Sequence, residues 1–395
     1  MIQECIDKKL IITEISFGNE FNESVETVSD LIHLEYITFG DRFNRSIKCL
    51  SKCVQLKHIV FGEKFNKSIK ALSKCTSLQQ ITFGGEFDQS IEAIAKCTNL
   101  RQITFSDGFN QPIKVLANCA NLQQITFGDL FDKPIDALAD CTNLQQITFD
   151  YSFNQSIEAL SSCTNLRQIT FGSNFIQPIG ALANCTVLQQ ITFGEVSVFN
   201  LSIEALAKCT NLRHITLGSW FNRSIEALAN CTDLQQITFG CYFDQPVEAL
   251  ANCTNLQQIT FGYDFNQPIH VLASCTNLQQ ITFGCYFNQP VEALASCANL
   301  RHITFGVRFN QPIKALANCT NLRQITFGSY FNRSVEALSN CTNLRQITFS
   351  EYSHFNQSVK ALVKCICLET ITFGKKSKFN QSTSDLINKV HIEYS

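Results

Sequence analysis

The fold is decided by a unit of 22 residues, which in its regular form reads Leu322-Arg-Gln-Ile325-Thr-Phe327-Gly328-Ser-Tyr-Phe331-Asn332-Arg-Ser334-Val335-Glu-Ala-Leu338-Ser-Asn-Cys341-Thr-Asn. The Ile-Thr-Phe-Gly tetrad, or a close variant, starts 17 times between Ile15 and Ile371, at intervals of 22 residues apart from two of 24. A period that runs through the whole chain indicates a solenoid, in which each repeat packs only on its neighbours. The 395 residues therefore need no separate globular domains.

Each unit combines a short strand with a short turn. In Leu-x-x-Ile-Thr-Phe the Ile and Phe point one way and the Thr the other, which predicts a β-strand with one buried face. The next residue is Gly in 14 of the 17 copies, and we expect a sharp bend there. Ten copies then carry Ser and seven carry Pro ahead of an Ile or Val. We expect Ser to cap a short helical turn and Pro to take its first position.

The unusual composition follows from columns of identical residues. All 33 Phe fall into two columns, one at the strand, interrupted by Leu217, and one before the Asn. We expect the stacked rings to dominate the core. The Asn column also holds Asp88, Asp132, Asp244 and Ile176, and we expect its side chains to satisfy backbone groups of the turns.

Two features of the unit resemble known repeats. Leu-x-x-Ile-x-Phe with an Asn and a later Cys resembles a leucine-rich repeat. The run from Ile259 to Ile269, Ile-Thr-Phe-Gly-Tyr-Asp-Phe-Asn-Gln-Pro-Ile, resembles the FNIP-type repeats of social amoebae and giant DNA viruses. The resemblance covers nearly the whole chain. It implies a leucine-rich-repeat-like solenoid and, if the chain is viral, a place in the host cytoplasm.

We therefore predict a β-solenoid of leucine-rich-repeat type. It should have about 17 turns of 22 residues, with a parallel β-sheet on one face and short helical or 3-10 turns on the other. We expect an N-terminal cap over residues 1–11, the solenoid over residues 12–381, and an irregular C-terminal cap turn over residues 382–395.

Fifteen of the 20 Cys form one column at the end of the turn, from Cys53 to Cys365. Buried reduced thiols suit this column, because side chains that point the same way on neighbouring turns have poor disulfide geometry. The alternatives are a disulfide framework and a metal ladder, although no His lies in register and Cys-x-x-Cys spacing is absent. We favour thiols without metal or cofactor, and a reducing, cytoplasmic compartment. Cys241 and Cys285 lie off the column, and we expect them to be exposed.

The positions that the repeat leaves free predict where a partner binds. The outward strand face carries columns of Gln or Arg, of Gln or His, and of Thr, and the residues between the strand-end Gly and the second Phe vary most. Three units insert two residues there, and insertions in repeat proteins often mark the binding face. Trp220, Tyr242, Tyr286 and Tyr330 share one register, so we expect them to line one edge as interface anchors. The candidate partner-binding residues are Trp220, Tyr242, Tyr263, Tyr286, Tyr330, Tyr352, Arg301, Arg323 and Arg345. The alternative interpretation is a solvated face with ordinary loop residues.

The sequence contains few motifs that indicate catalysis or ligand binding. It has no His-Glu-x-x-His motif and no phosphate-binding Gly-rich loop, and its seven His are scattered. A net charge of −2 argues against a nucleic-acid partner, and no apolar stretch is long enough to span a membrane. We predict a non-enzymatic protein–protein interaction scaffold with no catalytic residue, whose partner binds the sheet face or the variable loop edge. The alternatives are a structural element that forms homodimers through the solenoid ends, and an enzyme.

Overall fold

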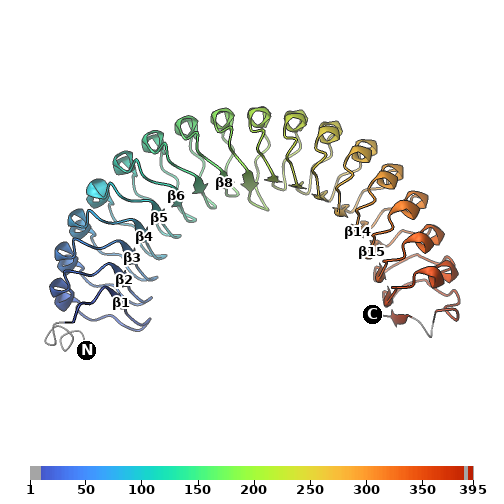
Figure 1. Ribbon diagram of the computed structural model, residues 1–395, viewed down its shortest axis with the longest axis horizontal. Helices are drawn as coiled ribbons and strands as arrows, with labels where there is room; N and C mark the ends of the chain where they lie inside the picture. Colours follow the sequence, from blue (N-terminus) through green and yellow to red (C-terminus); the bar gives the residue numbers. More distant parts are fainter. Residues whose placement is uncertain (1–9, 387–389, 395) are drawn as a thin grey trace. The chain divides into compact units, whose positions relative to one another are not determined.

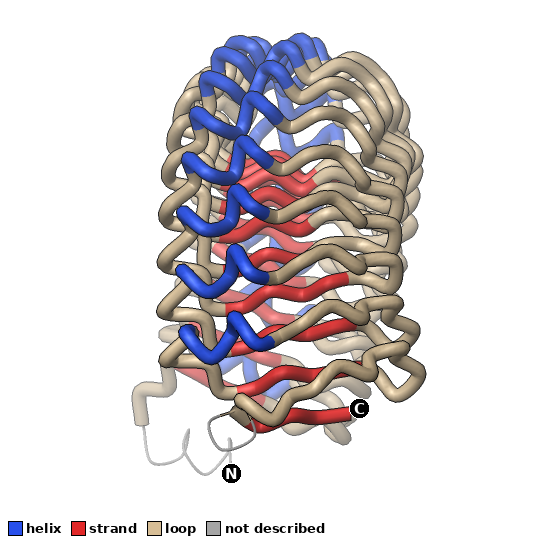
Figure 2. The backbone as a smooth tube through the Cα atoms, turned by 90° about the vertical axis from the view of Figure 1, so that its right-hand side faces the viewer, coloured by secondary structure: helices blue, strands red, loops and turns tan. Residues whose placement is uncertain are grey.

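A computed structural model of the chain describes residues 10–386 and 390–394. By their internal contacts the residues form two compact units, unit 1 (Met1–Gly194) and unit 2 (Glu195–Ser395). Within each unit the strands form one layer and the 3-10 helices another (Figures 1 and 2). In the part of the chain that is described, no helix is both long and apolar enough to cross a lipid bilayer.

Unit 1 alternates strands and 3-10 helices of five residues. Its described strands are β1 (Glu14–Ser16), β2 (Tyr36–Thr38), β3 (His58–Val60), β4 (Gln80–Thr82), β5 (Gln102–Thr104), β6 (Gln124–Thr126), β7 (Gln146–Thr148), β8 (Gln168–Phe171) and β9 (Gln190–Phe193). Its 3-10 helices are η1 (Glu26–Asp30), η2 (Lys48–Lys52), η3 (Lys70–Lys74), η4 (Glu92–Lys96), η5 (Lys114–Asn118), η6 (Asp136–Asp140), η7 (Glu158–Ser162) and η8 (Gly180–Asn184). Successive strands are parallel, and Ile pairs with Ile throughout, from Ile15 with Ile37 to Ile169 with Ile191.

Unit 2 repeats the same scheme. Its described strands are β10 (His214–Thr216), β11 (Gln236–Thr238), β12 (Gln258–Thr260), β13 (Gln280–Thr282), β14 (His302–Thr304), β15 (Gln324–Phe327), β16 (Gln346–Phe349), β17 (Thr370–Phe373) and β18 (His391–Tyr394). Its 3-10 helices are η9 (Glu204–Lys208), η10 (Glu226–Asn230), η11 (Glu248–Asn252), η12 (His270–Ser274), η13 (Glu292–Ser296), η14 (Lys314–Asn318), η15 (Glu336–Asn340) and η16 (Lys360–Lys364). Its successive strands are also parallel and in register. The predicted leucine-rich-repeat β-solenoid is confirmed.

The last strand was not predicted from the repeat. β18 lacks the tetrad, yet Ile392 pairs with Ile371 and Tyr394 pairs with Phe373. The Tyr394 ring takes the place of a column Phe, with its centroid 5.7 Å from that of Phe373. Residues 391–394 thus extend the sheet by one strand within the segment expected to be an irregular cap. The expected N-terminal cap, residues 1–11, lies outside the described residues except for Leu10 and Ile11.

The two Phe columns form a continuous aromatic core in each unit. Within one turn the rings of Phe149 and Phe153 stack with centroids 3.8 Å apart, and Phe149 lies 6.0 Å from Phe171 of the next turn. Unit 2 has the same spacing, with 3.9 Å between Phe261 and Phe265. Away from the terminal turns the described column rings are buried. Burial of each Phe ring stabilises the stack by about 1.5–3 kcal/mol.

The glycine residues at the strand ends are required for a reason other than the bend that the sequence led us to expect. A Cβ atom placed on Gly284 would lie 1.7 Å from the carbonyl oxygen of Gly262, and one on Gly262 would lie 1.8 Å from that of Gly240. Neither Gly262 nor Gly284 has a positive φ in the left-handed region. Glycine is needed here because the backbones of neighbouring turns approach too closely for a side chain.

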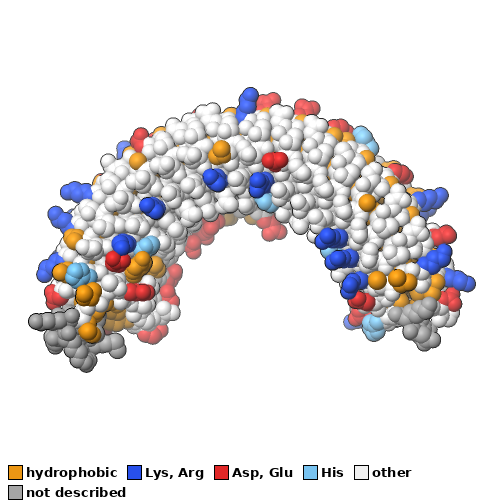
Figure 3. Space-filling view, viewed as in Figure 1, with side chains coloured by type: hydrophobic (Ala, Val, Ile, Leu, Met, Phe, Trp, Pro, Cys, Tyr) orange, Lys and Arg blue, Asp and Glu red, His pale blue; other side chains and the backbone are white. Residues whose placement is uncertain are grey.

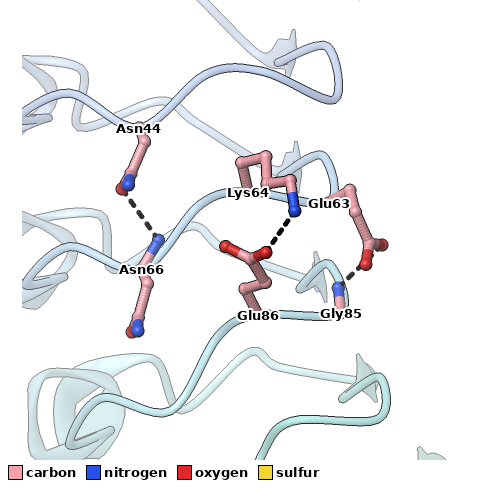
Figure 4. A network of polar contacts seen from close by, with 6 residues as sticks. All are labelled: Asn44, Glu63, Lys64, Asn66, Gly85 and Glu86. Carbon is pink, nitrogen blue, oxygen red and sulfur yellow. Dashed lines mark hydrogen bonds and ion pairs between the residues drawn. The ribbon is translucent and has the colours of Figure 1, made fainter.

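The Asn column forms the expected hydrogen-bonded ladder. The N–H of Asn66 donates to Oδ1 of Asn44 at 3.1 Å (Figure 4), and the same contact recurs in turns where the preceding column residue is Asn or Asp. Ile176, which has no side-chain acceptor, interrupts the ladder. Asp88 serves equally well, since its Oδ1 accepts the N–H of Asn110 at 2.9 Å and Nε2 of Gln111 at 3.0 Å. The side chain needs only an acceptor at this position, which explains why Asp can replace Asn.

The Ser/Pro column lies further from the 3-10 helix than predicted. Helix η15 begins at Glu336, whose N–H donates to Oγ of Ser334 at 3.2 Å across the buried Val335. Ser therefore caps the helix weakly from two residues before its first residue. Pro246 likewise lies two residues before Glu248, the first residue of η11, and not at the first helical position. The intervening Ile or Val must turn into the core, which displaces the helix start.

The cysteine column is buried, as predicted, and makes a contact that the sequence analysis missed. The Sγ of Cys75 donates to the carbonyl oxygen of Leu50 at 3.4 Å, and Cys319 donates to Leu294 at the same distance. Burial raises the pKa of the Cys75 and Cys319 thiols to about 12. Disulfide bonds are absent from the described residues. The column thus joins neighbouring turns by weak thiol hydrogen bonds.

Candidate interaction surfaces

The outward sheet face consists of short polar columns in both units. In unit 1 the N–H groups of Gln79 and Gln80 both donate to the carbonyl oxygen of Lys57, at 2.8 and 3.0 Å, and this contact repeats along the sheet. The backbone is therefore satisfied, and the Gln, Arg, His and Thr side chains are left to face outward. A hollow of about 250 Å³ lies among His58, Arg101 and the Gln side chains around them.

The predicted aromatic residues line one edge of unit 2. Trp220, Tyr242 and Tyr330 are about half exposed, and Tyr286 is partly buried. The N–H groups of Tyr242, Tyr286 and Tyr330 each donate to the carbonyl oxygen of the first variable residue of the preceding turn, and that of Trp220 donates to Ser197 of the inserted turn before it. All four stand directly before the second Phe of their turn and so occupy the same register. Tyr263 stands one residue earlier in its turn, and Tyr352 lies in an inserted segment. We call Trp220, Tyr242, Tyr263, Tyr286, Tyr330 and Tyr352 the aromatic edge.

Members of the aromatic edge contact their neighbours. The rings of Trp220 and Tyr242 lie 4.8 Å apart and are tilted, and Tyr263 meets Tyr286 edge to face at 5.1 Å. The guanidinium carbon of Arg308 lies 4.0 Å from the centroid of Tyr286, within cation–π range. Such contacts restrict the rings while leaving much of their surface exposed. These rings are therefore held in place by contacts within the chain.

Inserted residues change the edge without disturbing the core. In a regular turn the N–H of the second Phe donates to the strand-end Gly, as Phe331 does to Gly328 at 3.4 Å. In the inserted turns a serine hydroxyl accepts that N–H, as Ser353 does from Phe355 at 3.1 Å. The same arrangement joins Ser197 to Phe199 and Ser377 to Phe379. The serine that each insertion carries keeps the Phe column in place, a role that the sequence analysis did not assign.

The corresponding edge of unit 1 is acidic. Its variable positions include Asp41, Glu63, Asp107 and Asp129. Near the start of the chain the charges are partly paired, as between Lys64 and Glu86 (Figure 4), and Glu63 accepts the N–H of Gly85 at 3.1 Å. Loss of hydration and the neighbouring Asp150 carboxylate raise the pKa of Asp129. The equivalent edges of the two units thus differ in their chemistry.

Arg301, Arg323 and Arg345 stand on three successive turns, just before β14, β15 and β16. The N–H of Arg323 donates to the carbonyl oxygen of Arg301 at 2.8 Å, and Arg345 donates to Arg323 at 2.8 Å, so the three backbones lie side by side. Figure 3 shows Lys and Arg side chains gathered over the strands in this part of unit 2. Arg345 pairs with Glu369 at 3.0 Å, and all three side chains are exposed. We call these residues the arginine strip.

A histidine, His302, lies beside the strip. His302 follows Arg301 directly, and loss of hydration, together with the charges of Arg323 and Arg301, lowers its pKa. The Arg residues of unit 1 in this column, Arg101 and Arg167, stand between Gln residues and form no such run. The strip is therefore a local cationic feature of a chain whose net charge is −2.

The remaining candidate features are two off-column cysteines and a hollow on the 3-10 side. Cys241 is exposed and Cys285 is partly buried, so the expected exposure holds fully only for Cys241. A hollow of about 660 Å³ lies on the 3-10 side between Lys314, Arg333 and Lys364. Among the described residues, no three His, Cys, Asp or Glu side chains are grouped to hold a metal ion.

A family model described as "BspA type Leucine rich repeat region (6 copies)" matches the sequence repeatedly. The matched segments are residues 5–95, 32–136, 90–180, 134–249, 159–279, 225–311 and 274–384. Together they extend continuously from residue 5 to residue 384. No curated protein matches the sequence.

Solved structures of leucine-rich-repeat proteins resemble the chain throughout its length. The viral protein CroV588, a circular leucine-rich-repeat protein, is 28% identical with a TM-score of 0.69, and the match covers 97% of this chain and 59% of that one. Protein LIC12759 of Leptospira interrogans is 11% identical with a TM-score of 0.74, over 100% of this chain and 98% of that one. Toll of Drosophila, in its complex with Spatzle, is 14% identical with a TM-score of 0.70, over 100% of this chain and 58% of that one. The last two likenesses concern the fold alone.

Proposed function

Because the chain belongs to the BspA-type leucine-rich repeat family, we propose that it is a non-enzymatic scaffold that binds a protein partner through the aromatic edge of unit 2. The observation that carries this proposal is the half-exposed state of Trp220, Tyr242, Tyr263, Tyr330 and Tyr352 on one edge. Exposed Trp and Tyr are the side chains most often found as energetic anchors in protein interfaces. The core does not require them, since other turns carry Gly, Ser or Asp at equivalent positions.

The fold supports this use. Toll is a solenoid of the same kind and was solved in complex with Spatzle. The rings of the aromatic edge are held by contacts with one another and with Arg308, which lowers the entropy lost on binding. Partner binding therefore fits both the architecture and the preordered side chains.

The test is a comparison of three forms of the protein as bait in extract of the native cell, with bound proteins identified by mass spectrometry. The triple variant Trp220→Ala, Tyr242→Ala, Tyr286→Ala should lose partners that the wild type retains. Tyr151→Ala is the matched control, because Tyr151 is an equally exposed tyrosine on the edge of unit 1. Equal capture by the triple variant and the wild type refutes the proposal.

A second candidate function is self-association through the C-terminal end. Strand β18 pairs with β17 on one side, and Tyr394 is exposed. Nearby, Leu362, Leu386 and the largely exposed Ile366 line an apolar hollow of about 360 Å³. Light scattering over a concentration series tests it: a dimer that Ile366→Asp dissociates supports the homodimer, and a constant monomer mass excludes it.

We further propose that the repeats are of the FNIP subtype and that the protein works in a reducing cytoplasm. The support is the Phe-Asn-Gln-Pro-Ile run and the buried thiol column. Microscopy of the tagged chain in its native cell tests the compartment, and a secreted or membrane-bound protein contradicts it.

A further inference from the structure

The arginine strip has a regular spacing that the fold imposes. Neighbouring parallel strands lie about 4.8 Å apart, so Arg301 and Arg345 are separated by about 9.6 Å at the backbone. The hydrogen bonds from Arg323 to Arg301 and from Arg345 to Arg323, both 2.8 Å, hold the three residues at this pitch. A partner that pairs with all three must present its groups at a similar interval.

The strip lacks enough negative charge of its own. Arg345 pairs with Glu369, whereas Arg301 and Arg323 form no ion pair with any of the described residues. The next column contains His302, Gln324 and Gln346, which add no negative charge, and Gln324 and Gln346 hydrogen-bond to each other at 3.0 Å. Planar guanidinium groups that point outward bind carboxylates or phosphates with two parallel hydrogen bonds.

We propose that the arginine strip binds an acidic α-helix of the protein partner, with Glu or Asp side chains at positions i, i+3 and i+7. This inference rests on the proposed scaffold function and assigns it a second contact surface. In a helix, positions i and i+7 are about 10.5 Å apart along the axis, close to the 9.6 Å of the strip. In an extended strand, three successive residues on one face, i, i+2 and i+4, span about 13 Å and therefore fit the strip less well.

The geometry also sets the direction of the bound helix. The three Arg follow one another across the sheet, perpendicular to the strands, so the helix axis lies across β14, β15 and β16. The Thr column on the same face, Thr304, Thr326 and Thr348, lies beyond the His302, Gln324 and Gln346 column and adds only neutral hydroxyls. Charge pairing therefore supplies the specificity, and binding weakens as salt screens it.

The test uses a fluorescein-labelled helical peptide with Glu at i, i+3 and i+7 on one face. Its control has the same composition with the Glu residues spread around the helix. Fluorescence anisotropy measures Kd for the full chain at low and at moderate salt. The double variant Arg301→Gln, Arg323→Gln should weaken binding of the one-faced peptide about tenfold, as expected for the loss of two exposed charge pairs. Arg101→Gln, Arg167→Gln is the matched control and should leave Kd unchanged.

Each alternative occupant has a defined outcome. Equal affinity for the two peptides, or an equal loss in the control variant, overturns the proposal. Tighter binding of oligouridylate than of the one-faced peptide overturns it in favour of a phosphate ligand. A wild-type dimer that Arg301→Gln, Arg323→Gln dissociates in light scattering assigns the strip to a second copy and also overturns it. Failure of peptide binding leaves the aromatic-edge capture experiment intact, so the two proposals fail separately.

Discussion

Replacing Gly284 with Ala tests whether close approach of the turns explains the glycine column. A Cβ on Gly284 would stand 1.7 Å from the Gly262 carbonyl oxygen, and real Cβ contacts are essentially never shorter than 3.0 Å. The two backbones must therefore separate locally by about 1.3 Å. The nearby hydrogen bond from Tyr286 N–H to Tyr263 oxygen, 3.0 Å long, cannot survive such a shift unless the turn distorts.

The expected cost follows from these two effects. Overpacking costs about 1–3 kcal/mol, and the loss of one backbone hydrogen bond costs about 0.5–1.5 kcal/mol, so Gly284→Ala should destabilise by about 1.5–4.5 kcal/mol. Ser106, Asp150 and Ser350 replace glycine in other turns, so the solenoid accommodates a side chain and the variant should fold. Because repeat proteins respond locally, amide exchange should quicken most in β12, β13 and β14.

Gly180→Ala is the matched control. Gly180 is the exposed first residue of η8, and a Cβ there meets nothing within 4 Å. Alanine should stabilise at this site by about 0.4–1 kcal/mol through the unfolded chain. Urea unfolding and hydrogen-exchange mass spectrometry measure both variants. If Gly284→Ala is as well tolerated as Gly180→Ala, the close-approach explanation is wrong.

Three further predictions concern the polar and thiol columns. Asn266→Ala removes the acceptor of the Asn288 N–H, now at 2.9 Å, and should cost about 0.5–1.5 kcal/mol in urea unfolding, because this hydrogen bond is exposed and water can replace it, whereas Asn266→Asp should be nearly neutral. A thiol reagent should modify Cys241 and Cys367 rapidly in the native protein, while column thiols such as Cys275 should react only on unfolding; rapid reaction of the whole column contradicts its burial. Burial raises the pKa of thiols such as Cys253 to about 12 from 9.0, so the unfolded state loses these protons first as pH rises. The thiol contribution to stability should be constant below pH 9 and fall between pH 9 and 12, and a flat thermal-melting profile in that range contradicts this.

The repeated part of the fold was predictable because the same physical demands recur in every turn. Ile and Phe at alternate positions need one buried face, and Asn needs a backbone donor on the next turn, so periodicity alone placed the sheet and the ladder. The tetrad could not reveal β18, where Tyr394 replaces Phe and the spacing from Ile371 to Ile392 is 21 residues. It also could not separate a bend from a close approach at Gly284, because both favour glycine.

The sequence predicted where the candidate surfaces lie, but not which side chains contact one another there. Register alone aligned Trp220, Tyr242, Tyr286 and Tyr330, because equivalent residues of a solenoid occupy equivalent places. The contact between Tyr263 and Tyr286 crosses registers, and the Arg308 guanidinium reaches Tyr286 from the next turn. Such contacts depend on side-chain rotamers, which a repeat pattern does not specify.

The difference between the edge residues of the two units favours the edge of unit 2 as the binding surface. The core columns are the same in both, so folding makes the same demand on the edge of each turn. Yet the edge of unit 1 carries mainly carboxylates, such as Asp107 and Asp129, beside the exposed Tyr151, whereas exposed rings such as Trp220 and Tyr330 recur along that of unit 2. An exposed ring gains little for the isolated chain and increases the risk of aggregation, so its recurrence on one edge supports the proposed contact with a partner. The partner should therefore be lost when the edge of unit 2 is altered, and retained when the equivalent edge of unit 1 is.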